Sequence, residues 1–272
     1  WGWCAYFFSS ADQCADGPDR QAHDGKPFLQ WYLEQVRNYE KETGVRLVDY
    51  LDIHFYPQEN GIAEDNESSY VAKRRFQSLK SLYDPHFVDE SWISEPIRLI
   101  PRMKEMIDQY NPGMKLAITE YNFGNGTGLS AGLAQAEALA IFGREGVDLA
   151  TRFGNLRAGT PLGDAIKMYL DYDGQGSSLD GTSVAASSSN VNAVGAYAIE
   201  GVNGELFVLL FNKDTVARRT AIAADRALDD QAEAYRFTAE QRWGAVDAEA
   251  EQTDEGFALM LPARSATLLV WK

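Results

Sequence analysis

One carboxylate stands at the end of an apolar stretch of the sequence. Residues 115–124 read Lys-Leu-Ala-Ile-Thr-Glu-Tyr-Asn-Phe-Gly, so a short apolar run ends on Glu120. The run follows an Asn-Pro-Gly turn at 111–113 and leads toward Gly124, a pattern typical of a buried parallel strand. An ionised Glu at such a strand end costs free energy unless donors surround it. We therefore take Glu120 as the catalytic candidate; a structural salt bridge or a cap for the next helix is the alternative.

A second apolar segment carries polar side chains at the same kind of position. Residues 46–56 predict a strand, and His54 and Tyr56 lie at its carboxyl end. Being two residues apart, they face the same way. If this strand lies beside the one that ends at Glu120, then His54, Tyr56 and Tyr121 are plausible donors to the carboxylate. A lone His is also often a hydrogen-bonded core residue, so that alternative stays open.

The elements around these strands alternate between strand and helix patterns. The predicted elements are strands at 1–8, 46–56, 115–120 and 146–153 and helices at 27–44, 70–83, 97–107, 129–144 and 161–172. This succession predicts parallel βα units. About four units are visible, whereas a closed (β/α)8 barrel needs eight. We therefore predict an α/β fold in which residues 1–176 form the C-terminal half of an incomplete (β/α)8 barrel of the TIM type.

The composition changes after the last predicted helix. Residues 174–192 are rich in Gly, Ser and Asp, and helical spacing is lost beyond them. Short alternating stretches follow, and Asn203-Gly204 is a strong hairpin turn between two of them. The pattern predicts an antiparallel β-sandwich domain over residues 177–272.

Composition and charge restrict the partners. The chain has 272 residues, is 45% hydrophobic and carries a formal net charge of −15. An acidic surface repels phosphates, so we expect no nucleic-acid partner and no anionic membrane. No apolar stretch is long enough to span a bilayer. A neutral substrate is compatible with this charge.

The first residues and the cysteines bear on where the protein works. The opening Trp-Gly-Trp-Cys-Ala-Tyr-Phe-Phe reads as a core strand with nothing before it to cover it, so we expect the sequence to come from a longer chain. Cys4 on that strand and Cys14 in the next loop could pair in a secreted protein, but buried free thiols are favoured. The histidines at 23, 54 and 86 are too scattered for a metal site, and no cofactor is expected; a structural calcium ion is assigned to no residue.

Several motifs in residues 1–152 occur together in a specific order. They are Trp-Gly-Trp-Cys-Ala-Tyr-Phe-Phe-Ser-Ser (1–10), Pro-Phe-Leu-Gln-Trp-Tyr-Leu (27–33), Leu-Asp-Ile-His-Phe-Tyr-Pro-Gln (51–58), Val-Asp-Glu-Ser-Trp-Ile (88–93), Ala-Ile-Thr-Glu-Tyr-Asn-Phe-Gly (117–124) and Phe-Gly-Arg-Glu-Gly-Val-Asp-Leu-Ala-Thr-Arg (142–152). Together they resemble glycoside hydrolase family 44. The resemblance implies endo-acting, retaining β-1,4-glucanases built from a (β/α)8 barrel and a β-sandwich, acting on cellulose-type chains and often on xyloglucan.

The resemblance also implies roles for individual residues. Glu120 matches the nucleophile and Trp92 an aromatic of the substrate cleft, while Phe153 stands where the family is expected to have Trp. The family's acid/base Glu, in an Asn-Glu context on an earlier strand, has no counterpart here, so we expect it to lie outside this chain. Aromatic rings can also stack on sugars. The substrate-binding candidates are Trp92, Tyr6, His54, Tyr56, Tyr121 and Phe153.

The sequence therefore predicts a retaining glycoside hydrolase that cuts β-1,4-glucans internally by double displacement. We expect a secreted parent protein that acts as a monomer on a polysaccharide, and an inactive chain when the acid/base residue is missing. The alternatives are a retaining xylanase or mannanase, and an inactive fragment or carbohydrate-binding module.

Overall fold

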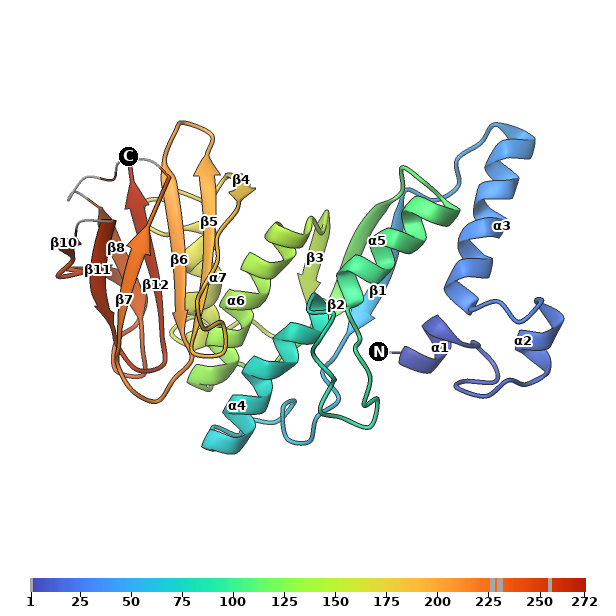
Figure 1. The fold of residues 1–272 in the computed structure, drawn as a ribbon, viewed down its shortest axis with the longest axis horizontal. Coiled ribbons are helices and arrows are strands. Elements are labelled where there is room, and N and C mark those ends of the chain that lie inside the picture. Colours follow the sequence, from blue (N-terminus) through green and yellow to red (C-terminus); the bar gives the residue numbers. More distant parts are fainter. Residues whose placement is uncertain (1, 226–227, 229–231, 254–255) are drawn as a thin grey trace. The chain divides into compact units, whose positions relative to one another are not determined.

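The structure is a computed structural model that describes residues 2–225, 228, 232–253 and 256–272 (Figure 1). The chain divides into two compact units, which we describe separately. The first comprises residues 1–58, 80–122 and 145–153, and the second comprises 59–79, 123–144 and 154–272. The domain boundary predicted after residue 176 stays a prediction.

A parallel sheet lies at the centre of the first unit. Its strands are β1 (Tyr50–Phe55), β2 (Lys115–Tyr121) and β3 (Leu149–Arg152), side by side in the order β1-β2-β3 (Figure 1). Both pairings are parallel, and the register places His54 opposite Glu120. Because the carboxyl ends of parallel strands meet at one edge, the predicted proximity of these two residues is confirmed.

Two longer helices pack together in this unit, α3 (Phe28–Thr43) and α5 (Leu99–Tyr110). The predicted stop at Gly44 is confirmed, because Gly44 takes a left-handed φ of 72° and its N–H reaches the carbonyl of Glu40. On α5, the buried residues recur at helical spacing: Leu99, Ile100, Met103 and Ile107. The face that they form packs toward β2. The remaining helices of the unit are α1 (Trp3–Phe7) and α2 (Pro18–Ala22).

The first residues form a helix, so the strand predicted there is wrong. Trp3 and Phe7 are both buried, and their ring centroids lie 4.7 Å apart, as expected of residues four apart on one helix face. Aromatic residues favour strands by propensity, but tertiary packing overrides that preference here. The prediction of free thiols is also wrong, because Cys4 and Cys14 form a disulfide with 4.6 Å between their Cα atoms.

A buried arginine organises the first part of the second unit. The unit begins with the loop 59–68 and helix α4 (Ser69–Ser78). The 3₁₀ helix η1 (Leu79–Leu82) follows in the chain, and from residue 80 onward it belongs to the first unit. The Arg75 side chain is fully buried and donates to the carbonyls of Ile62 at 2.9 Å and Glu64 at 3.1 Å. It also pairs with Glu67 at 3.2 Å. The loop before α4 is therefore held by its own helix.

Antiparallel sheets make up most of the second unit, as the sequence predicts from residue 193 onward. The sheet orders are β4-β5-β6-β12-β8-β9 and β10-β11-β7. The strands are β4 (Gly181–Val184), β5 (Val194–Gly201), β6 (Leu206–Asn212), β7 (Arg218–Ala223), β8 (Glu233–Phe237), β9 (Gly244–Val246), β10 (Glu251–Thr253), β11 (Gly256–Leu261) and β12 (Ser265–Trp271). The predicted hairpin is confirmed: Gly204 has a φ of 97° between β5 and β6. Leu210 of one sheet and Leu259 of the other belong to the same apolar cluster.

Two helices accompany these sheets, α6 (Leu129–Glu145) and α7 (Pro161–Leu170), and both match the predicted ranges closely. Glu137 of α6 forms a buried ion pair with Lys213, which follows β6. Helix α6 is thus attached to the six-stranded sheet. Among the described residues, no helix has both the length and the apolar character needed to cross a membrane.

Candidate active site

Glu120 has neutral or weakly basic partners. The Tyr56 hydroxyl donates to Glu120 Oε2 at 2.9 Å, and His54 Nδ1 lies 3.2 Å from the same oxygen. The Glu120 side chain is 36% exposed. In the part of the chain that the structure describes, Glu120 forms no ion pair with Lys or Arg. The geometry favours a reactive carboxylate over a structural salt bridge or a helix cap.

The strand ends explain this arrangement. Glu120 lies near the carboxyl end of β2, His54 lies opposite it on β1, and Tyr56 follows β1 directly. On the other side of His54, its backbone N–H donates to the Tyr6 hydroxyl at 3.3 Å. Helix α1 therefore brings Tyr6 to the strand end, although we expected a strand there. A phenol that accepts a backbone hydrogen bond is more restrained than a freely placed stacking ring.

Electrostatics keep both phenols protonated. Burial, the hydrogen bond to Glu120 and the Glu120 charge together raise the pKa of Tyr56 to about 12. Burial also raises the pKa of Tyr6, with the charges of Asp52 and Glu120 adding to the effect. A phenolate beside a carboxylate is disfavoured. Tyr56 therefore remains a hydrogen-bond donor to Glu120 through the physiological pH range.

Phe153 borders this pair at the end of β3. The residue is 56% exposed, and its ring lies edge-on to the Tyr56 ring with 6.3 Å between the ring centroids. Its backbone is fixed, because Asn122 Nδ2 and Arg152 Nη1 donate to the Phe153 carbonyl at 2.9 Å and 3.1 Å. Burial lowers the pKa of Arg152. The exposed ring is thus presented from a rigid backbone next to a residue that contacts Glu120.

The other predicted site residues differ in exposure. Trp92 is 61% exposed, and its indole N–H donates to Gln58 Oε1 at 3.4 Å. Tyr121 is only 2% exposed, so it lies in the core and offers no face to a ligand. Sequence reasoning missed Gln58, Asn122 and Arg152 as contributors. Their positions directly beside the strand-end motifs were the available signal.

The nearest acidic neighbour of this cluster on β1 is Asp52. Among the described residues of the first unit, Glu120 is the carboxylate that both His54 and Tyr56 contact. Asp52, two residues before His54, accepts a hydrogen bond from the Thr119 hydroxyl instead. The described residues also contain no group of three or more His, Cys, Asp or Glu side chains placed to hold a metal ion.

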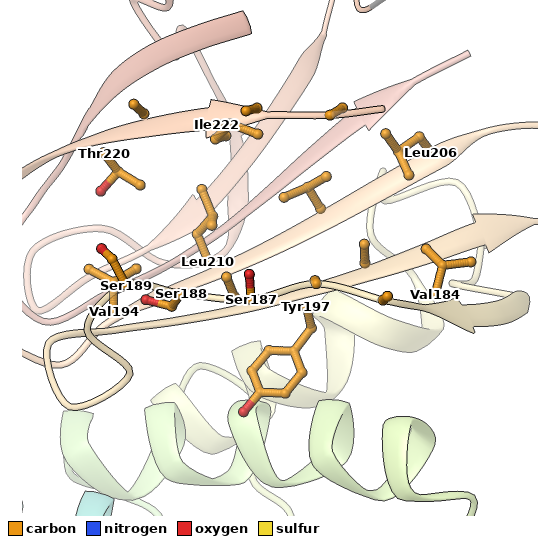
Figure 2. A pocket seen from close by; sticks show the side chains of 18 of the residues that line it. Val184, Ser187, Ser188, Ser189, Val194, Tyr197, Leu206, Leu210, Thr220 and Ile222 are labelled. Carbon is orange, nitrogen blue, oxygen red and sulfur yellow. The ribbon is translucent and has the colours of Figure 1, made fainter. Parts of the chain in front are cut away.

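A cavity of about 950 Å³ lies within the second unit, between the antiparallel sheets. Figure 2 shows Leu210 and Ile222, which come from different sheets, while the Tyr197 ring points away toward the helix that carries Glu137. The lining is mainly small and apolar, with Ser187, Ser188 and Ser189 along one side. It contains none of the predicted site residues. Glu120 remains the candidate for chemistry.

Comparisons with known proteins bear on the family of the chain. The model of glycoside hydrolase family 44 matches residues 1–59. The solved structure of CelM2, a bifunctional glucanase-xylanase from a metagenome library, is 37% identical with a TM-score of 0.94, covering 99% of this chain and 54% of that one. The chain therefore resembles glycoside hydrolase family 44 in sequence and in structure.

Two further proteins are similar to this chain. A β-mannanase/endoglucanase A of Caldicellulosiruptor saccharolyticus is 35% identical over 240 residues, which cover 78% of this chain and 18% of that protein. A family 44 xyloglucanase of Paenibacillus polymyxa, solved with xyloglucan, is 26% identical with a TM-score of 0.87, covering 99% of this chain and 55% of that one. The chain thus spans about half the length of these solved structures and less of the curated protein.

Proposed function

We propose that Glu120 is the nucleophile of a retaining glycoside hydrolase, and that the protein containing this chain cuts β-1,4-glucans internally. One observation carries the proposal. Tyr56 and His54 both face Oε2 of Glu120, and the carboxylate remains partly exposed. Donors to the charged form favour an ionised carboxylate, which is the form that attacks.

In the proposed reaction, a Glu120 oxygen attacks the anomeric carbon of the sugar and forms a glycosyl-enzyme ester. The glycosidic bond breaks, and a second carboxyl group gives its proton to the leaving oxygen. That group then removes a proton from water, which attacks the same carbon and frees Glu120. Retention requires the two carboxyl groups to lie about 5–5.5 Å apart. We propose that a part of the parent protein outside this chain supplies the second group.

The proposed architecture combines a catalytic half-barrel with a β-sandwich. We assign the parallel strands β1, β2 and β3 to one half of a (β/α)8 barrel within residues 1–176, because catalytic groups lie at the carboxyl ends of barrel strands. We assign residues 177–272 to a β-sandwich, supported by the apolar cluster that the two antiparallel sheets share.

The substrate is proposed to be a neutral β-glucan, either a cellulose-type chain or xyloglucan. The names of the relatives support this class, and they also include mannanase and xylanase activities. A retaining xylanase or mannanase is therefore the second candidate. We propose that the parent is secreted and monomeric, and the Cys4–Cys14 disulfide fits an oxidising compartment.

Trapping the intermediate tests the proposal directly. The parent protein is incubated with an activated 2-deoxy-2-fluoro cellobioside, and its peptides are analysed by mass spectrometry. We expect the sugar on the peptide that contains Glu120, because the fluorine slows release of the ester. Labelling of another carboxylate would reassign the nucleophile. A parent that binds cellohexaose but releases no sugar and takes no label would instead be a carbohydrate-binding module.

A further inference from the structure

Trp92 lies on a backbone that is held from both sides. Before it, Asp89 is buried and accepts hydrogen bonds from the Ser81 hydroxyl at 2.8 Å and the Ser91 N–H at 3.0 Å. After it, Ile93 is 6% exposed and lies in the core. The indole between these anchors is 61% exposed. The position of the Trp92 backbone is therefore fixed by the loop, while the orientation of its ring needs another restraint.

The Gln58 side-chain amide restrains the orientation of the Trp92 ring through a hydrogen bond. Its Nε2 donates to the Tyr56 carbonyl at 2.7 Å, and its Oε1 accepts from Trp92 Nε1 at 3.4 Å. A carbonyl oxygen can only accept and an indole N–H can only donate. Only one orientation of the Gln58 amide therefore satisfies both partners. Glutamate lacks the donor at this position, and alanine lacks both groups.

Tyr56 forms hydrogen bonds both to Gln58 and to Glu120, the proposed nucleophile. The Tyr56 backbone carbonyl binds Gln58, and the Tyr56 hydroxyl donates to Glu120 Oε2. A short series of hydrogen bonds thus connects Trp92, through Gln58 and Tyr56, to the reacting carboxylate. A flat, exposed ring at a fixed place relative to that carboxylate is suited to stacking on a sugar ring.

We propose that Gln58 is a positioning residue that fixes the Trp92 ring as a sugar platform relative to Glu120. This inference rests on the proposed function. Gln58 touches neither the reacting atoms nor the sugar, and it acts through the indole N–H of Trp92. Its loss therefore weakens the binding of oligosaccharides that reach Trp92 and leaves the chemical step unchanged.

A double-mutant cycle in the parent protein tests the inference. The variants are Gln58→Ala, Trp92→Phe and the pair of them, with Gln35→Ala, an exposed glutamine on α3, as the matched control. We expect Gln58→Ala to raise KM for cellohexaose about three- to tenfold with kcat unchanged, the size of one partly exposed hydrogen bond. Trp92→Phe keeps an aromatic face but removes the N–H. The double variant should therefore differ in KM from Trp92→Phe by less than twofold. Gln35→Ala should likewise differ from the wild type by less than twofold.

The same cycle is repeated as a binding measurement. Each variant is combined with Glu120→Gln, and the dissociation constant for cellohexaose is measured by calorimetry. The inference is overturned if Gln58→Ala has the same effect with Phe at position 92, if it lowers kcat instead of affinity, or if it has no effect. Full activity of Glu120→Gln would contradict the assignment of Glu120 as the nucleophile. The binding measurements would still test the coupling between Gln58 and Trp92.

Discussion

Two glutamates of this chain have opposite surroundings. Glu120 is 36% exposed and contacts a phenol and an imidazole. Glu137 in the second unit is 2% exposed, and its Oε1 accepts from Lys213 Nζ at 2.7 Å and from the Tyr197 hydroxyl at 3.2 Å. The Glu120 carboxylate is accessible to a ligand, whereas the Glu137 carboxylate is buried against the Lys213 ammonium group. Charge compensation by a buried lysine holds structure together, and weaker donors leave a carboxylate able to react.

The comparison predicts that substitution of Glu120 lowers activity, whereas disruption of the Glu137 ion pair lowers stability. Glu120→Gln in the parent protein should lower kcat for carboxymethyl cellulose by at least about a thousandfold, because the amide cannot form the glycosyl ester. Its midpoint of urea unfolding should stay near that of the wild type. Reducing-sugar release and unfolding are measured on the same preparation. Unchanged turnover, or a large loss of stability, would remove the distinction.

The buried pair should show the reverse behaviour. Lys213→Met leaves the Glu137 charge buried without its cation, and breaking such a pair costs about 3–5 kcal/mol of unfolding free energy. Urea unfolding of the chain, followed by circular dichroism, measures the loss. The double variant Glu137→Leu with Lys213→Met should recover much of it, since no charge remains buried. A Lys213→Met protein as stable as the wild type would mean that the pair is not compensating a buried charge.

The disulfide restrains the helix that carries Tyr6. Cys4 and Cys14 are ten residues apart in sequence, so the closed loop is short. Replacing both by Ser should lower the unfolding free energy by about 2–3 kcal/mol, chiefly by freeing the unfolded chain. Urea unfolding with and without dithiothreitol measures this effect, and the Cys4→Ser/Cys14→Ser variant should not respond to the reductant. Equal stability of the oxidised and reduced wild type would contradict the prediction.

Local patterns in the sequence were enough to predict that three polar side chains lie together at the strand ends. A carboxylate closing an apolar run identified Glu120, and residues two apart on a neighbouring strand identified His54 and Tyr56. The short alternating stretches and the Asn203-Gly204 turn also predicted the antiparallel sheets beyond residue 192. These signals are short-range, because strand ends and hairpin turns are encoded within a few residues.

Features that depend on distant contacts were not predictable. The aromatic start was taken for a strand, since nothing in its composition shows that Trp3 and Phe7 pair on a helix. The contact between Gln58 and Trp92 joins residues that are 34 apart in the sequence. Glu137 and Lys213 are 76 residues apart. Such pairings follow from tertiary packing, on which local propensity has little influence.

The smallest expected effect concerns the titration of Tyr56. Its pKa is raised to about 12, with burial as the largest cause and the hydrogen bond and charge of Glu120 next. An unfolded tyrosine titrates near pH 10, so the unfolded state loses this proton first, and Tyr56 makes the folded state progressively less favourable between about pH 10 and 12. Below pH 10 the effect is absent, because both states are protonated.

Glu120→Gln removes the charge but leaves the burial, so it should lower the pKa of Tyr56 without returning it to the ordinary value. Ultraviolet difference titration of Glu120→Gln and wild type, each with and without Tyr56→Phe, isolates this one phenol among the tyrosines. The absorbance step assigned to Tyr56 should move to lower pH in Glu120→Gln. If the step stays in place, Glu120 is not the charge that Tyr56 senses, and the contrast with the lysine-compensated Glu137 loses its electrostatic basis.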